Sequence, residues 1–341
     1  MKKSEHKKST PEYRYVGIDV SSATLSVAWE GAGGAQAQVE VKNTTEGHQE
    51  ILQRVKPSQG APVRAVVEAT SVYMLDVAIA LHDAGVSVMV VNPFQARKFA
   101  EAQHRRSKTD AVDAQLLKEY GSRMEWKAWE PPSAPVMALR QMARRIKQVV
   151  ALRVAEENRL HVANTTATTT PEILEDLEAT IAHFREREAA LSAHALTLIR
   201  QSDELNAAYQ HVTSVRGIAD RTAVVLLGEL LVLPKEMTGK QVVAYAGLDP
   251  RHRQSGAVAL PVHISRVGNA QIRAALYLPA LCASQHDPVA KAFVDRLHAN
   301  GKARKSAIVA LMRKMLVLLW ALIQTKSMYD ADRWAGLKKV A

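Results

Sequence analysis

The chain is nearly devoid of cysteine. Cys282 is the single cysteine among 341 residues, which excludes a disulfide bond within the chain. The sequence also has no CxxC pair and no His/Cys spacing typical of a zinc site. Cys282 falls in an apolar segment of helical character, so we predict a packed thiol rather than a reactive one.

Long uninterrupted apolar runs are also absent. The most apolar stretch, residues 308–323, carries Arg313 and Lys314, and the segment before Tyr13 lacks the apolar core of a signal peptide. A membrane-spanning helix needs about 20 predominantly apolar residues. We therefore predict a soluble, cytoplasmic protein with no membrane partner.

Acidic residues are in deficit. There are 34 Asp and Glu residues against 45 Lys and Arg, giving a net charge of +11, and 47% of the residues are hydrophobic. This length and composition can supply the cores of two compact domains and a helical arm. The basic residues gather in four clusters: Lys2, Lys3, Lys7 and Lys8; Arg105, Arg106 and Lys108; Arg140, Arg144, Arg145 and Lys147; Lys302, Arg304 and Lys305. Each cluster is compatible with a solvated face, but their position beside the motifs below favours contacts with a nucleic-acid backbone.

Two acidic residues stand at the ends of short apolar stretches. The stretches 15–20 and 63–67 have strand length and many β-branched residues, and they place Asp19 and Glu68 at their carboxyl ends. Such ends are the usual place for chemistry in an open α/β sheet. Further strands are predicted at 24–29, 39–41 and 86–91, and helices at 45–56, 75–84 and 93–102. Three strands followed by alternating helices and strands resemble the ribonuclease H or RuvC-like fold of nucleases and transposases.

Two more acids lie on a predicted helix. Asp110 and Asp113 occur in the segment SKTDAVD at 107–113, and a spacing of three places them on one helix face. With Asp19 and Glu68 they make four carboxylates, the ligand type that Mg²⁺ prefers. Two such ions about 4 Å apart can stabilise the attacking and leaving oxygens of an in-line displacement at phosphorus.

Each acid also has a simpler interpretation. Asp19 fits a turn, Glu68 a solvated strand end, and Asp110 a helix cap in the pattern Ser107-x-x-Asp110. Asp113 fits an ion pair with Lys108 or Lys118. The order, spacing and strand placement of all four acids together favour the metal site.

The middle of the chain has helical periodicity. Apolar residues recur at steps of three and four between 138 and 163, and again from 172 to 198 with Glu188 as the interruption. The polar segment 164–171 between them contains poor helix formers and ends in proline. We predict a long helical, coiled-coil hairpin. It serves either as an internal spacer or as a dimerisation arm, and the position of the motifs at opposite ends of the chain favours the arm.

Residues 215–223, followed by the apolar run 224–231, resemble a helix-hairpin-helix that binds DNA through backbone N–H groups. Ala219 stands where that module usually has its second glycine. A helix-turn-helix that serves only packing is an equal alternative.

A serine stands in a basic loop near the other end. Ser255 lies in the segment QSG at 254–256, just after Arg251, His252 and Arg253. A serine hydroxyl needs a base, a metal or an electropositive setting to attack phosphorus. The loop by itself fits an ordinary Ser-Gly turn equally well.

The motifs together resemble the IS110 family of insertion-sequence transposases, relatives of the Piv/MooV DNA invertases. The segments YVGID at 15–19, VEAT at 67–70, NP at 92–93 and KTDAVDA at 108–114 are similar to the family's DEDD domain. The segments YAGLDP at 245–250, QSG at 254–256, ISRVG at 264–268 and RAAL at 273–276 are similar to its C-terminal transposase domain. The resemblance covers roughly residues 13–330.

The resemblance implies a domain order. A RuvC-like DEDD domain is expected at 13–130, a helical coiled-coil arm at 131–208 and a mainly helical transposase domain at 209–330, between a basic tail at 1–12 and a short tail at 331–341.

The resemblance also implies an activity, that of a DNA transposase or recombinase that cuts and rejoins strands. Ser255 is implied to be the nucleophile, and Asp19, Glu68, Asp110 and Asp113 to hold Mg²⁺. The implied partners are donor and target DNA, a noncoding bridge RNA, and further subunits in a dimer or tetramer where the acids of one subunit join the serine of another. The candidates for neutralising phosphates are Arg105, Arg106, Lys108, Arg251, Arg253, Arg266 and Arg273.

Two other functions stay open. A RuvC-like junction nuclease would use water and need only the acids, and it predicts that Ser255→Ala still cuts DNA. A catalytically silent nucleic-acid-binding scaffold predicts that Asp110→Ala binds normally and that no strand is broken. The Ser-Gly loop argues against the first and the intact acidic set against the second.

Overall fold

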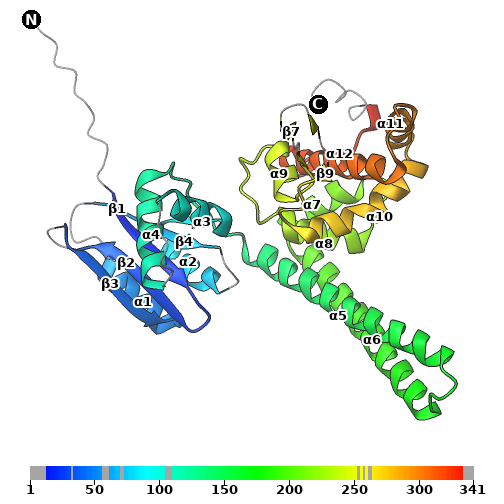
Figure 1. Cartoon of the computed structure of the whole chain (residues 1–341), viewed down its shortest axis with the longest axis horizontal. Helices are drawn as coiled ribbons and strands as arrows, with labels where there is room; N and C mark the ends of the chain where they lie inside the picture. The colour runs from blue at the N-terminus through cyan, green and yellow to red at the C-terminus, as the bar shows by residue number, and fades with distance from the viewer. Residues whose placement is uncertain are drawn as a thin grey trace, which may run out of the picture. The chain divides into compact units, whose positions relative to one another are not determined.

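The structure is a computed structural model of the whole chain (Figure 1). It describes residues 13–31, 34–55, 61–69, 73–103, 110–251, 254–255, 258–259 and 263–332, with only the backbone for residues 110, 111, 254, 255, 258 and 259. The chain divides into two compact units, Met1–Pro131 and Pro132–Ala341.

The first unit is built on a five-stranded mixed sheet. Its strands are β1 (Arg14–Val20), β2 (Thr24–Glu30), β3 (Gln36–Lys42), β4 (Val63–Glu68) and β5 (Ser87–Val91), in the order β3-β2-β1-β4-β5. The first three pair antiparallel, whereas β4 and β5 add in parallel on the other side of β1. The order of elements along the chain confirms the predicted three strands followed by alternating helices and strands, the order that resembles a ribonuclease H or RuvC-like domain.

Helices cover both faces of this sheet. They are α1 (Thr45–Val55), α2 (Met74–Asp83), α3 (Pro93–Ala102) and α4 (Asp110–Arg123). Side chains of a strand alternate between faces, so Val16 and Ile18 pack in one buried cluster with α1 and α2, whereas Val66 packs in another with Leu117 and Tyr120 of α4. The result is a three-layer domain, with α4 in front of the sheet in Figure 1.

Helix α4 packs so closely on the central strand β1 that no side chain fits between their backbones at Gly17. A Cβ added to Gly17 would lie closer than 3.0 Å to the carbonyl oxygen of Ala114 and the amide nitrogen of Lys118. One added to Gly121 would lie 2.5 Å from Val66 and 3.2 Å from Tyr15. Because Tyr15 lies beside Gly121 and Gly17 beside the turn 114–118, α4 runs antiparallel to β1 and begins at the carboxyl end of that strand.

This contact makes Gly17 a sensitive position. The methyl group added in Gly17→Ala would push the backbone of α4 away from the backbone of β1. We therefore expect this substitution to lower the free energy of unfolding of the first unit by about 3 kcal/mol or more. Hydrogen exchange of the β1 amides in urea measures this loss. Gly31→Ala is the matched control, because its added Cβ would meet nothing closer than 3.5 Å. Equal stability of the two variants would contradict the close approach.

The second unit is almost entirely helical. A hairpin of two long helices, α5 (Ala134–Thr165) and α6 (Pro171–Gln201), precedes a helical domain. The elements of that domain are α7 (Asp203–Thr213), α8 (Asp220–Leu230), α9 (Gly239–Tyr245), β6 (Pro250–Arg251), β7 (Gln254–Ser255), β8 (Val258–Ala259), β9 (His263–Ile264), α10 (Ala270–His286), α11 (Pro288–Ala299) and α12 (Arg304–Thr325).

The two long helices confirm the predicted hairpin, with its turn at 166–170. Val149 and Ile181 are buried along the pair. Glu188, which interrupts the apolar pattern, accepts a hydrogen bond from Arg153 of the facing helix at 3.0 Å. An ion pair between the helices therefore occupies the place of an apolar contact. Supercoiling and a role in dimerisation stay predictions.

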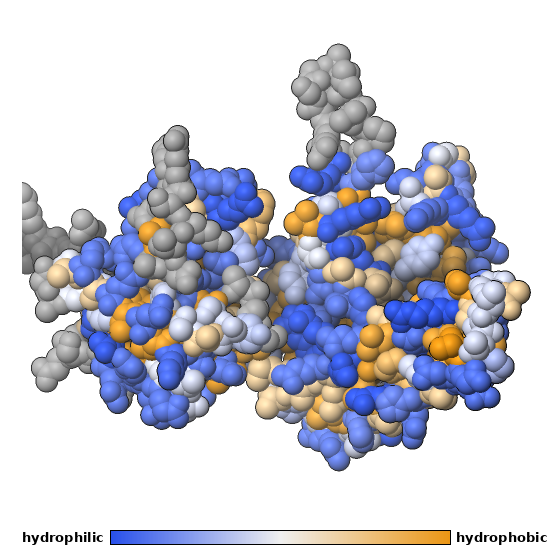
Figure 2. Space-filling view, turned by 60° about the horizontal axis from the view of Figure 1, so that its bottom comes forward, coloured by the Kyte–Doolittle hydropathy of each residue, from blue (hydrophilic) through white to orange (hydrophobic). Residues whose placement is uncertain are grey.

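Helix α12 contains the apolar stretch noted in the sequence. It is the one helix in the described part of the chain that is long and apolar enough to cross a membrane. Leu311, Met315 and Leu319 are fully buried in the core of the second unit, so the apolarity of α12 is accounted for by packing. The face in Figure 2 is mainly hydrophilic over both units, with smaller hydrophobic areas between the hydrophilic residues.

The prediction of a packed cysteine was wrong. Cys282 is exposed on α10, although its neighbours Ala280 and Ala283 are buried. The segment is helical as expected, but an apolar composition does not tell which positions of a helix face the core.

The turn between α7 and α8 is used in packing. Gly217 has a φ of 94°, and a Cβ there would lie 2.8 Å from the carbonyl oxygen of Pro279. The Arg216 guanidinium donates to the carbonyl oxygen of His286 at 2.7 Å. Contacts at both residues hold the turn against α10, which favours the packing interpretation of this helix-turn-helix.

Candidate active site

Asp19 and Glu68 lie at the same level of adjacent parallel strands. Ile18 of β1 is paired with Val67 of β4, so the next residue of each strand is one of the two acids. Neighbouring strands are about 4.8 Å apart. Gly17 and Val66 face α4, and side chains alternate along a strand, so both acids, two residues further on, also face α4.

The start of α4 reaches the same edge of the sheet. A strand rises about 3.3 Å per residue and a helix 1.5 Å, so the step from Gly17 to Asp19 corresponds to about four residues of α4. Counting back about four residues from the turn 114–118, which lies on Gly17, reaches the turn 110–114, which contains Asp113 and therefore lies beside Asp19. The backbone of Asp110 is one helical turn further toward the start. Three of the acids, together with the backbone of Asp110, therefore lie at the same edge of the sheet, where β1 and β4 end.

The residue types and their backbone placement fit a divalent cation, because carboxylates are hard oxygen ligands. The side chain of Asp110 lies outside the described residues. Among the side chains that are described, no group of three or more His, Cys, Asp or Glu residues has the geometry of a metal site. The metal-binding roles of the four acids therefore stay a proposal.

Lys118 is one of the two candidate ion-pair partners of Asp113. The side chain of Lys118 is buried and donates to Oε1 of Gln36 at 2.5 Å. Ser107 and Lys108, the candidate capping and pairing partners, lie outside the described residues.

Asn43 connects the two loops that flank the acids. Its Nδ2 donates to the carbonyl oxygen of Ser21, two residues after Asp19, at 3.0 Å, and to that of Tyr73 at 3.2 Å. Its Oδ1 lies 2.9 Å from Nε2 of His48. Since Nδ2 is the donor toward the two carbonyls, Nε2 of His48 must carry the proton. Burial lowers the pKa of His48 in spite of Asp76 and Glu46 nearby, which favours this neutral form. No sequence motif indicated this role of Asn43.

Ser255 lies in the outer part of a small β-hairpin. At its base, β6 pairs with β9 through Pro250–Ile264 and Arg251–His263. Further out, β7 pairs with β8, with Ser255 opposite Val258. The side chain of Ser255 is not described, and His252, Arg253 and Gly256 lie outside the described residues.

The base of this hairpin, residues 245–249 and 264–269, is held together by several hydrogen bonds. The amide of Ser265 donates to the carbonyl oxygen of Asp249 at 2.9 Å, and its hydroxyl donates to the Asp249 carboxylate. The amide of Arg266 donates to the carbonyl oxygen of Gly247 at 3.1 Å. The two segments that enter and leave the hairpin are thus fixed to each other.

The basic residues predicted to bind phosphates divide into three groups. Arg251 and Arg266 are exposed beside the hairpin base, as a phosphate contact requires. Arg273 donates from Nη1 to the carbonyl oxygens of Ala246 at 2.8 Å and Gly268 at 3.2 Å, so it also supports the hairpin base. Arg105, Arg106, Lys108 and Arg253 lie outside the described residues.

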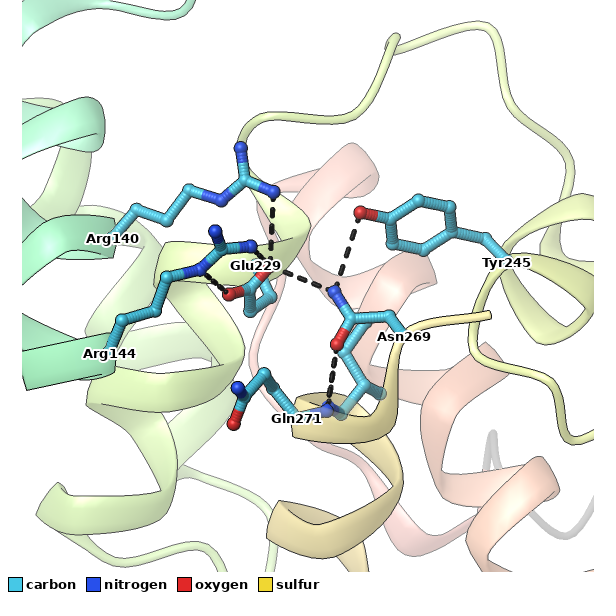
Figure 3. Close-up of polar contacts among 7 residues, drawn as sticks. Arg140, Arg144, Glu229, Tyr245, Asn269 and Gln271 are labelled. Atoms are coloured by element: carbon cyan, nitrogen blue, oxygen red, sulfur yellow. Dashed lines mark hydrogen bonds and ion pairs between the residues drawn. The ribbon is translucent and has the colours of Figure 1, made fainter. Parts of the chain in front are cut away.

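A buried carboxylate lies beneath the hairpin base (Figure 3). Glu229 of α8 is 1% exposed and accepts from Arg144 at 2.7 and 3.1 Å, from Arg140 at 3.3 Å and from Nδ2 of Asn269 at 2.8 Å. Burial raises the pKa of Glu229, but the two arginines and Asn269 outweigh it and hold the pKa below its usual value. The sequence signal for this site is an acid inside an apolar helical run, and no motif marks it.

Comparisons with known proteins match both ends of the chain. The DEDD transposase profile of the IS110 family matches residues 16–164, and the profile of the transposase IS116/IS110/IS902 family matches residues 209–295. The pilin gene-inverting protein of Moraxella bovis is 27% identical over 328 residues, which cover 93% of this chain and 97% of the relative. An IS110 insertion-element protein of Streptomyces coelicolor is 29% identical over 172 residues, covering 50% of this chain and 41% of the relative.

Among solved structures, T. thermophilus RuvC in complex with a Holliday junction substrate matches 33% of this chain and 96% of its own, at 16% identity and a TM-score of 0.24. This score is too low to bear on the fold. The two family profiles, by contrast, match in the order that the motifs predicted, with the four acids inside the first and Ser255 inside the second. This chain therefore belongs to the IS110 family of transposases and is a DNA transposase or recombinase.

Proposed function

We propose that the chain is the transposase of an insertion sequence, and that it cuts and rejoins DNA through a phosphoserine intermediate at a Mg²⁺-dependent site. The observation that carries this proposal is the placement of Asp19 and Glu68 at one level of the sheet edge where α4 begins. The same chain carries a serine on a small β-hairpin in its second family-matched region.

The chemistry is an exchange of oxygens at phosphorus. The Ser255 hydroxyl oxygen attacks the phosphodiester, the bond from phosphorus to one DNA oxygen breaks, and that oxygen leaves as a hydroxyl after taking up a proton. The serine hydroxyl gives up a proton at the same time, so the step is balanced. A DNA hydroxyl reverses it on the new partner strand. Because one phosphoester replaces another, rejoining needs no ATP.

The acids hold the metal in this proposal. Asp19 and Glu68 are fixed by paired strands, and Asp113 by a helix packed backbone to backbone on Gly17. Asp110, one turn earlier, completes the set. When bound between these carboxylates, Mg²⁺ offsets the negative charge that develops on the attacked phosphate. Rigid elements suit this role because small displacements of catalytic groups are costly.

The proposed partners are donor and target DNA, a noncoding bridge RNA and further copies of the chain in a dimer or tetramer. The net charge of +11 and the exposed Arg251 and Arg266 beside the serine hairpin support a nucleic-acid partner. In the oligomer, the acids of one subunit and the serine of another would complete one site. The protein would act in the cytoplasm, where its DNA is.

Binding to DNA should weaken steeply with salt. Each neutralised phosphate releases counterions, so the logarithm of the affinity falls with the logarithm of salt at a slope of about −0.9 per contact on duplex DNA. We expect Arg251→Ala to reduce this slope by about one, measured by fluorescence anisotropy between about 50 and 200 mM salt. Arg54→Ala is the control, since Arg54 pairs with Glu50 in the other unit. An unchanged slope in Arg251→Ala would exclude a phosphate contact there.

The proposal is tested by incubating the protein with Mg²⁺, the noncoding RNA that flanks its element, and labelled donor and target DNA. Denaturing gels then detect covalent protein–DNA adducts. The proposal requires an adduct that forms only with Mg²⁺. Cleavage without any adduct would identify a water-using nuclease, and binding without cleavage a silent scaffold.

A further inference from the structure

Three structural elements meet at the buried carboxylate of Glu229: the base of the helical hairpin, helix α8 and the base of the Ser255 hairpin (Figure 3). We propose that Glu229 is a positioning residue for Ser255, which acts through Asn269 to fix the serine hairpin to the first turns of α5. The inference rests on the proposed function in taking Ser255 as the nucleophile.

Toward α5, the carboxylate binds two arginines that lie one helical turn apart. Arg144 donates from Nε and Nη2, the two-pronged geometry in which arginine binds carboxylates most strongly, and Arg140 adds a third bond. The backbone of α8 is also close here, because a Cβ added to Gly228 would lie 3.0 Å from Cα of Arg140. Helices α8 and α5 are thus joined by the close backbone approach at Gly228 and by the side-chain bonds of Glu229.

Toward the hairpin, the carboxylate binds one residue whose orientation is fixed. Oδ1 of Asn269 accepts from the amides of Gln271 and Ile272 at the start of α10, at 2.8 and 3.3 Å. The Nδ2 group therefore must point the other way, toward Glu229 at 2.8 Å and the Tyr245 hydroxyl at 3.4 Å. The Asn269 side chain links the helix start to the carboxylate in one orientation only.

The backbone of Asn269 joins the two segments of the hairpin base. Its amide donates to the carbonyl oxygen of Tyr245 at 2.7 Å. The preceding Gly268 has a φ of 139°, and a Cβ there would lie closer than 3.0 Å to the same carbonyl oxygen. The chain entering the Ser255 hairpin at 245 and the chain leaving it at 269 are therefore fixed at the residue that Glu229 holds.

The carboxylate is required because every partner of Glu229 is a donor. A glutamine in its place presents an NH₂ group that must face a guanidinium or the amide of Asn269, and the two partly buried arginines lose their buried countercharge. Removing one partner of a buried ion pair leaves an uncompensated charge. We expect the hairpin base to loosen, and a displacement of about 1 Å at a reacting group can cost about a hundredfold in rate.

The test is single-turnover adduct formation at saturating DNA by Glu229→Gln. Loss of folded protein lowers the amplitude of this reaction, whereas misplacement of Ser255 lowers its rate constant. We expect the rate constant to fall by about 10- to 100-fold with DNA affinity unchanged. Asn269→Ser keeps a helix cap but removes the link to Glu229, so we expect a similar fall. The double variant should be no slower than the slower single variant, because both act through one link.

Glu188→Gln is the matched control, since Glu188 also binds two arginines in the second unit but does not contact the hairpin base. Its rate constant should equal that of the wild type. Hydrogen exchange provides a readout that does not depend on chemistry: the amides of Ser265, Arg266 and Asn269 should exchange faster in Glu229→Gln and Asn269→Ser than in Glu188→Gln. Unchanged exchange and an unchanged rate constant in Glu229→Gln would overturn the inference. A wild type without any adduct would instead overturn the proposed function, and the exchange data would still decide whether Glu229 holds the hairpin.

Discussion

Ser255→Ala should reduce the rate of covalent adduct formation by at least about a thousandfold. In the proposed mechanism the Ser255 hydroxyl supplies the attacking oxygen, and removing a catalytic nucleophile typically costs several orders of magnitude. DNA and RNA binding should be unchanged, because the substitution removes a single hydroxyl from a two-residue strand. Denaturing gels with labelled DNA measure the adduct, and anisotropy measures binding.

Two further serine variants sharpen this comparison. Ser284→Ala is the control for folding, because its hydroxyl only donates to the carbonyl oxygen of Leu281 within α10. Ser265→Ala removes a hydroxyl in the hairpin base that is already bound to Asp249. An adduct that survives in Ser255→Ala but disappears in Ser265→Ala would show that Ser255 is not the nucleophile. Strand cleavage at the wild-type rate in Ser255→Ala would favour a nuclease that uses water.

The second large effect is expected from Asp19→Asn. The substitution removes a negative charge from the edge of the sheet without changing the size of the side chain, so metal affinity should fall while the fold persists. Metal ions supply several kcal/mol of transition-state stabilisation in phosphoryl chemistry. We therefore expect strand cleavage to fall by about a thousandfold at low millimolar Mg²⁺, and a chelator to have the same effect on the wild type.

Asp83→Asn is the matched control for this variant, because Asp83 lies in the same unit and its side chain is 69% exposed. It should cleave at the wild-type rate at every Mg²⁺ concentration. The cleavage rate of Asp19→Asn is measured as a function of Mg²⁺ concentration. A half-saturating Mg²⁺ concentration higher than that of the wild type identifies Asp19 as a ligand. Wild-type rates at all concentrations would exclude Asp19 from the metal site.

Local patterns in the sequence predicted the elements that carry the acids. The β-branched stretches at 15–20 and 63–67 became β1 and β4, and Pro93 opened α3 as expected. Strand β3 was predicted at 39–41 but spans Gln36–Lys42. Its first residues alternate polar side chains at an exposed sheet edge, so they carry little apolar signal, although they pair fully with β2.

Contacts between distant segments were not predictable in the same way. Gly17 reads as a small residue in a strand, and only the approach of α4 shows why a side chain does not fit there. Glu229 reads as an interruption of an apolar helix, but its arginine partners lie 85 and 89 positions away. Periodicity along a chain identifies the buried face of one element, whereas the choice of partner depends on how two elements meet.

The most direct test locates the DNA on the protein. The wild-type adduct is digested with nuclease and trypsin, and the peptide 254–266, which contains Ser255 and Ser265, is fragmented in a mass spectrometer. We expect the remaining nucleotide on Ser255, and no modified peptide when Mg²⁺ is omitted or Asp19 is replaced by asparagine. A nucleotide on any other residue, or cleaved DNA with no modified peptide, would contradict metal-assisted catalysis by Ser255.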